Sequence, residues 1–106
     1  MADVGTTKLF ENEKVVVWEM VLEPGEKTGV HTHGNDYLFY AIEGSTAEVM
    51  DEDGEVLDEL EITTGSVMYL SIDGDELVAG ENRFPATHDA KNIGTTRYRE
   101  ILVEFK

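Results

Sequence analysis

Short apolar runs separated by glycine-containing turns divide this sequence, and their spacing limits what the chain can fold into. Five runs of four to eight residues are rich in Val, Ile, Leu and aromatic side chains, and they span residues 15–22, 36–42, 47–50, 67–72 and 99–105. Apolar residues never recur at helical spacing for long enough to demand a helix. We therefore predict an all-β sandwich or barrel, with at most one helical turn near residues 5–13 or 75–83.

One hairpin is predicted in detail. The run at 47–50 and a second run at 56–60 flank the acidic segment 51–55, which contains Asp-Gly. An Asp-Gly pair between two apolar runs is a strong signal for a tight turn between antiparallel strands. We expect residues 51–55 to form the tip of this hairpin.

The size and composition favour one small domain. With 106 residues and 41% hydrophobic content, the chain suits a single domain, residues 1–106, around one modest core. It contains no cysteine, which excludes disulfides, thiolate metal sites and cysteine nucleophiles. The N-terminus lacks a secretory signal pattern and no apolar run reaches membrane-spanning length, so we expect a cytoplasmic protein without a membrane partner.

The charge balance argues against nucleic-acid binding. The chain has 23 acidic and 8 basic residues, for a net charge of −15, and it has no basic patch to neutralise phosphates. Apolar and aromatic residues occur throughout, which argues against a disordered acidic chain. Two interpretations remain: a strongly hydrated surface, as in a salty habitat, or a surface made for a basic partner.

The histidines predict a metal site. The chain has three, and two of them, His31 and His33, are two residues apart. On a strand, alternate side chains share a face, so these two imidazoles can converge on one point. Imidazole is the commonest protein metal ligand, and His88 is the one remaining histidine to supply a third. The alternative is three ordinary histidines with satisfied hydrogen bonds.

The spacing of these residues resembles a known family. Gly, five residues, His-x-His, three residues, Tyr, six residues and Gly stand in order, at Gly25, His31, His33, Tyr37 and Gly44. This pattern resembles the first conserved motif of the cupin superfamily, in which glutamate is usual where Tyr37 stands. Residues 65–70 and 88–92 resemble the two ends of the second cupin motif. The short chain with His-x-His-Gly-x-Asp-Tyr also resembles small cupins associated with β-alanine degradation.

The resemblance implies a cupin-type double-stranded β-helix, or jelly-roll barrel, with one divalent transition metal inside it. His31, His33 and His88 would be the ligands, and the ion would be Fe, Ni, Zn, Mn or Cu. Two departures from the family pattern stand out. Ser71 replaces a common proline, and about a dozen extra residues precede His88, among them 75–84, which we expect to form a loop at the barrel mouth.

Tyr37 is the candidate catalytic residue, with three roles open. Its phenol would bind the metal as phenolate, would hydrogen-bond a metal-bound water, or would be a core aromatic. Its neighbour Asp36 would point the other way, and would either orient a histidine or end a turn. Asn92 is expected to cap a turn and to take no part in chemistry.

The last apolar run alternates, and we expect its apolar members to face the core, namely Ile101, Val103 and Phe105. Glu100 and Glu104 would then face water. The same parity would direct Arg99 inward, where it would bind a substrate carboxylate; alternatively, strand twist carries it to water or to a surface acid.

The function that these observations favour is a metal-dependent enzyme acting on a small, carboxylate-bearing molecule. The resemblance to cupins makes an oxygenase, a lyase or an isomerase the candidate reaction types. The alternative is a binding or sensing module that holds a metal or small ligand without turnover. We also expect a homodimer, formed through an outer sheet or a swapped terminal strand.

Overall fold

A computed structural model describes all 106 residues and contains eleven β-strands and no helix. In chain order the strands are β1 (Thr7–Glu11), β2 (Val15–Leu22), β3 (His31–Thr32), β4 (Tyr37–Glu43), β5 (Ser45–Met50), β6 (Val56–Ile62), β7 (Val67–Asp73), β8 (Glu76–Ala79), β9 (Asn82–Pro85), β10 (Thr87–Asn92) and β11 (Tyr98–Phe105). The predicted all-β class is confirmed. Neither of the two helical turns considered above forms, and no helix is present that could span a membrane.

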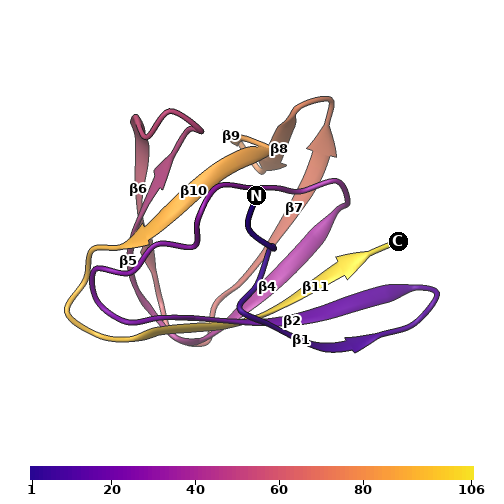
Figure 1. Cartoon of the computed structure of the whole chain (residues 1–106), viewed down its shortest axis with the longest axis horizontal. Coiled ribbons are helices and arrows are strands. Elements are labelled where there is room, and N and C mark those ends of the chain that lie inside the picture. The colour runs from indigo at the N-terminus through magenta and orange to yellow at the C-terminus, as the bar shows by residue number, and fades with distance from the viewer.

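The strands form two antiparallel sheets. Seven strands pair in the order β1-β2-β11-β4-β7-β8-β9, and four pair in the order β3-β10-β5-β6. Strands that are distant in the sequence lie side by side, since β11 lies between β2 and β4, and β10 between β3 and β5. Figure 1 shows β5, β6 and β10 facing β2, β4, β7 and β11. The two sheets form a jelly-roll without closing into one hydrogen-bonded barrel.

The core lies between the two sheets. On β4 the buried residues alternate with more exposed ones, so that Tyr37, Phe39 and Ala41 point inward. Their ladder partners on the neighbouring strand β7 include Leu70, which is also buried. Burial of side chains such as these, at roughly 1.5–3 kcal/mol for each large one, is the main force that holds the sheets together.

The parity predicted for the last strand is wrong. On β11 the buried positions are Tyr98, Glu100, Leu102 and Glu104, while Ile101, Val103 and Phe105 lie on the outer face. The register explains the difference, because Leu102 pairs with Trp18 on one side and with inward-facing Phe39 on the other. The outer face of this sheet is also apolar, so hydrophobic alternation alone does not distinguish the two faces.

The two hairpins had different outcomes. The predicted hairpin at 47–60 is confirmed, since β5 and β6 pair antiparallel around residues 51–55. The extra segment at 75–84 is a hairpin of β8 and β9 that extends the seven-stranded sheet, rather than an irregular loop. Its Leu77 and Phe84 are buried in the core, which explains why the segment is ordered.

Candidate metal centre

Strand pairing brings the three histidines together. His31 lies on β3 and His88 on β10, and the two residues stand directly opposite each other in the antiparallel ladder. His33 follows β3, where its backbone N–H donates to the carbonyl of Ala86 at 3.0 Å. The backbone is therefore extended across His31–His33, and the residues two apart share a face as predicted.

The three side chains are buried and close to one another. His31 and His33 are each 3% exposed and His88 is 9% exposed. One ring nitrogen from each histidine lies within 4.8 Å of the others. The Nε2 atoms of His31 and His33 are 3.1 Å apart, which is short enough for both to bind a single ion at about 2.0–2.1 Å.

Backbone carbonyls orient two of the three rings. His31 Nδ1 lies 2.8 Å from the carbonyl oxygen of Gly29, and His88 Nδ1 lies 2.8 Å from that of Pro85. Each Nδ1 therefore carries the proton it donates, which leaves the Nε2 lone pair free. A histidine whose second nitrogen is held in this way is typical of metal sites.

The third ring, that of His33, cannot satisfy both of its nitrogens with hydrogen bonds while the cluster holds no cation. His33 Nδ1 is buried without a hydrogen-bond partner. The Nε2 atoms of His33 and His31 face each other. If the His33 proton is on Nδ1, the two Nε2 lone pairs oppose each other. If it is on Nε2, that atom donates to His31 and Nδ1 is left as a buried acceptor without a donor. A cation bound to both Nε2 atoms removes the opposition between the lone pairs.

A proton is a poor candidate for that cation. Burial, together with the nearby His31 and His88, lowers the pKa of His33 to about 2. Burial also lowers the pKa of His88 to about 4 and that of His31 below its usual value. All three rings are thus neutral at pH 7, which is the form that binds metal ions. The donor set fits a divalent transition metal.

Tyr37 packs against this cluster. Its ring stacks on His33 with a centroid distance of 4.2 Å and an interplanar angle of 14°. Burial raises the pKa of Tyr37 above its usual range, and the carboxyl groups of Glu100 and Glu104 raise it in the same direction. The phenol is therefore protonated in the protein without metal.

The histidines and Tyr37 line an internal cavity of about 100 Å³. Since one water takes up about 30 Å³ in the liquid, this volume suits about three water molecules or a small organic molecule. The walls are mostly apolar and come from both sheets; they include Met20, Leu22, Phe39, Val49, Leu70 and Phe84. No lysine or arginine lines the cavity.

Comparison with solved structures identifies the fold. A cupin domain from Bordetella pertussis Tohama I matches with a TM-score of 0.69 at 22% identity, over 94% of this chain and 90% of that one. An RmlC-like cupin family protein with a double-stranded β-helix fold, from Methanocaldococcus jannaschii, matches with a TM-score of 0.63 at 19% identity, over 92% and 75% of the two chains. This chain has the cupin fold.

A third cupin-like match is a named enzyme. The polyketide cyclase RemF from Streptomyces resistomycificus matches with a TM-score of 0.58 at 19% identity, over 92% of this chain and 61% of that one. No protein-family model and no curated protein matches the sequence. At these identities the similarity concerns the arrangement of the strands.

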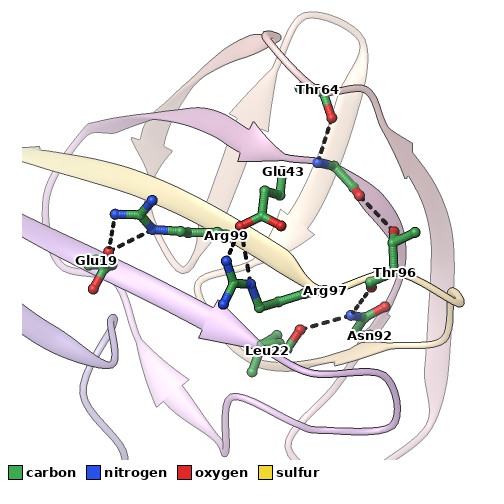
Figure 2. A network of polar contacts seen from close by, with 9 residues as sticks. Glu19, Leu22, Glu43, Thr64, Asn92, Thr96, Arg97 and Arg99 are labelled. Carbon is green, nitrogen blue, oxygen red and sulfur yellow. Dashed lines mark hydrogen bonds and ion pairs between the residues drawn. The ribbon is translucent and has the colours of Figure 1, made fainter.

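Arg99 of this cupin fold lies away from the histidine cluster. It is on the outer face of β11, where its guanidinium pairs with Glu19 of β2 at 2.6–2.7 Å (Figure 2). This is the second of the two alternatives, in which the arginine reaches a surface acid. The inward and outward positions of β11 are the opposite of those predicted. The neighbour of Arg99, Glu100, therefore points into the cavity.

Asp36 and Asn92 are structural in this cupin fold. Asp36 Oδ1 accepts from the backbone N–H of Ile72 at 2.8 Å, so it ties the start of β4 to β7 and does not touch a histidine. Asn92 is 1% exposed, and its amide donates to the carbonyls of Leu22 and Thr96, both at 2.9 Å (Figure 2). Its Oδ1 accepts from Gly94 N, which fits the predicted turn cap.

Sequence reasoning missed two groups near the site. Asp89 Oδ1 accepts from Gly29 N at 3.0 Å and from Thr28 Oγ1 at 3.1 Å, so it fixes the loop whose Gly29 carbonyl orients His31. Its position next to His88 was the available signal. Glu100 and its hydrogen-bond partner Tyr98 line the cavity. They were missed because the sequence analysis assigned the inward face of β11 to the other set of alternating residues.

Proposed function

We propose that this protein is a metal-dependent enzyme of the oxygenase, lyase or isomerase type, acting on a small molecule inside the jelly-roll. The observation that carries the proposal is the position of the three neutral imidazoles on the wall of a cavity. The cluster contains no carboxylate, so three protein ligands leave coordination positions open toward the cavity. Open positions are typical of catalytic rather than structural metal sites.

In this proposal each part of the site has a separate task. His31, His33 and His88 hold Fe, Ni, Zn, Mn or Cu, and the bound ion would polarise a substrate oxygen or a water molecule. Tyr37, stacked on His33, holds a proton at its hydroxyl oxygen and is the candidate acid. The apolar walls exclude bulk water, which strengthens polar interactions within the cavity.

The alternative is a module that binds or senses a metal or small ligand without turnover. One observation favours it: the histidine rings form hydrogen bonds with Thr28, backbone carbonyls and each other, and with no carboxylate, while Tyr37 only stacks on His33. Such a site would hold an ion firmly and would supply little acid–base chemistry.

A screen on metal-loaded protein distinguishes the two. Protein loaded separately with Fe(II), Ni(II), Mn(II) and Zn(II) is tested for oxygen uptake and for substrate loss with small thiols and carboxylates. The enzyme proposal predicts turnover with at least one pair, and loss of that turnover in His88→Ala. Binding of the ions without turnover across the screen would support the binding module instead.

We also propose that two copies associate through the outer face of the seven-stranded sheet. An in-register row of apolar side chains crosses five strands there, consisting of Phe10, Val17, Val103, Leu38 and Tyr69. Phe10 is 53% exposed and Tyr69 50% exposed. The chain has 23 acidic residues to cover its surface, so a continuous apolar row left in water is unusual and is typical of an interaction site.

The distribution of charge favours a second copy as the occupant. The charged residues that the register places on this face form ion pairs with one another: Arg99 with Glu19, and Arg83 with Asp73 and Glu76. The face is therefore close to neutral, whereas the whole chain carries a net charge of −15. Two such acidic molecules repel each other least across this face.

The oligomeric state tests this interface. Val103→Asp and Tyr69→Asp should convert a dimer to a monomer in sedimentation experiments. Val56→Asp is the matched control, because Val56 is a 52% exposed apolar residue on β6 of the other sheet and should leave the dimer intact. A wild-type protein that is monomeric, or variants at 103 and 69 that remain dimeric, would contradict the proposal.

A further inference from the structure

The cavity contains a buried acidic side chain that the proposed chemistry does not use. Glu100 lies on the inward face of β11, is 9% exposed, and pairs in the sheet with Met20 on one side and Ala41 on the other. Its carboxyl accepts one hydrogen bond, from the Tyr98 hydroxyl at 2.7 Å. Both residues line the same cavity as the three histidines.

One hydrogen bond is too few for this group. The two oxygens of a carboxylate offer about four acceptor sites, and a buried polar group without partners is costly. Burial accordingly raises the pKa of Glu100 to about 7. Glu104, four residues along the same face, differs in a useful way: it accepts from Trp18 Nε1 at 2.7 Å and does not line the cavity.

The rest of the cavity gives Glu100 no second partner. The amide of Asn92, which also lines the cavity, already donates to two backbone carbonyls. No lysine or arginine is present in the wall. The free acceptor capacity of Glu100 therefore faces an otherwise mostly apolar space, on the sheet opposite the one that carries His31 and His88.

We infer that Glu100 determines the ligand that this cavity accepts: a small, mainly apolar molecule with a hydroxyl or amino group that donates a hydrogen bond to its carboxyl. The inference rests on the proposed use of the cavity as the substrate site. A molecule that bridges the sheets would meet the metal ligands on one side and Glu100 on the other. When the Glu100 carboxyl is ionised it can only accept hydrogen bonds, so a ligand whose far end carries only acceptor groups would leave it unpartnered and would bind more weakly.

An isomer pair tests the inference without knowledge of the substrate. Both 1-butanol and methyl propyl ether have the formula C4H10O, and only the alcohol can donate. Titrations of zinc-loaded protein at pH 8.5, where the Glu100 carboxyl is ionised and only accepts, should give about three- to tenfold tighter binding of the alcohol by NMR, as expected for one added hydrogen bond. Glu100→Leu should reduce this ratio to about one.

Two further variants keep the test decisive. Glu104→Gln is the matched control and should preserve the preference for the alcohol, because Glu104 lies outside the cavity wall. Tyr98→Phe removes the donor that now satisfies Glu100 and should increase the preference, which gives a readout even where Glu100→Leu folds poorly. Equal binding of the isomers to the wild type, no binding of either, or an unchanged ratio in Glu100→Leu would overturn the inference.

The same titration on His33→Ala separates this inference from the proposed metal function. A preference for the alcohol that persists in a variant still binding metal normally would contradict the role of His33 and leave Glu100 as the selecting residue. Normal metal binding by the wild type with no preference between the isomers would reject the role of Glu100 and leave the metal site standing.

Discussion

His33 is the residue on which the metal site most depends. Its Nδ1 is buried without a partner, whereas His31 and His88 each have a backbone carbonyl that fixes the ring. The stack with Tyr37 is the contact that holds the His33 ring in place. The aromatic ring at position 37 and its hydroxyl therefore have separable effects.

Substitution of Tyr37 tests this separation. Tyr37→Phe retains the stack, so metal content should match the wild type and stability should stay within about 1 kcal/mol. If the hydroxyl acts as the acid, turnover in this variant should fall by about 10²–10⁴. Tyr37→Leu should in addition lower metal affinity, because the His33 ring loses its support. A Phe variant with wild-type turnover would show that Tyr37 is only a core aromatic.

Glu100 makes stability depend on pH. The folded protein keeps a proton on Glu100 up to about pH 7, whereas the unfolded chain releases it near 4.5. Unfolding therefore releases a proton between these values, and stability falls as pH rises through this range, by about 3 kcal/mol in total.

Urea unfolding of the wild type and Glu100→Gln at pH 4 and pH 8 measures this effect. Because glutamine does not titrate, the free energy of unfolding of the variant relative to that of the wild type should rise by about 3 kcal/mol from pH 4 to pH 8. Contributions from the histidines are common to both proteins and cancel in the difference. An equal difference in stability at both pH values would show that Glu100 titrates normally.

At the scale of elements, the turn between β10 and β11 depends on one side chain. Asn92 donates to carbonyls before and after it in the chain, and accepts from Ser45 Oγ and Gly94 N (Figure 2 shows its bonds to Leu22 and Thr96). Asn92→Ala leaves these buried groups unpaired, and we expect it to cost about 2–4 kcal/mol in urea unfolding.

Asn12 provides the matched control for that substitution. It also accepts two backbone N–H groups, from Lys14 and Val15, but in an exposed turn where water replaces it. Asn12→Ala should therefore cost about 1 kcal/mol or less. Similar losses for the two alanine variants would mean that burial of Asn92 adds nothing.

The strands that were predicted correctly carry local signals. The β5–β6 hairpin follows from an Asp-Gly turn between apolar runs, and the His31–His33 pair follows from the period of a strand. The inward face of β11 did not follow, because both of its faces carry apolar residues and only the pairing with β2 and β4 decides between them. The placement of Arg99 and Glu100 depends on this long-range register.

The site was predictable only in part for the same reason. The histidine spacing indicates which side chains can share a face, and the family resemblance indicated that His88 would join them. The carbonyls that orient the rings belong to Gly29 and Pro85, whose side chains give no signal for this role. Tertiary contacts alone reveal that Tyr37 stacks on His33.

At the scale of the whole molecule, repulsion between negative charges is the main factor that makes stability depend on salt. A net charge of −15 on 106 residues produces self-repulsion that the six ion pairs of the structure offset only locally. Salt should stabilise the protein, since the Debye length falls from about 10 Å at 0.1 M to about 3 Å at 1 M. A melting temperature that is flat or falls between 0.1 and 1 M NaCl would contradict this expectation.

The central claim is that the three histidines together hold one divalent metal ion. Metal analysis of purified protein, dialysed after loading with Zn(II) or Fe(II), tests it most directly. We predict one ion per wild-type chain and its loss in both His33→Ala and His88→Ala, with Glu104→Gln retaining the ion as the control. Full metal content in either histidine variant, or none in the wild type, would contradict the account.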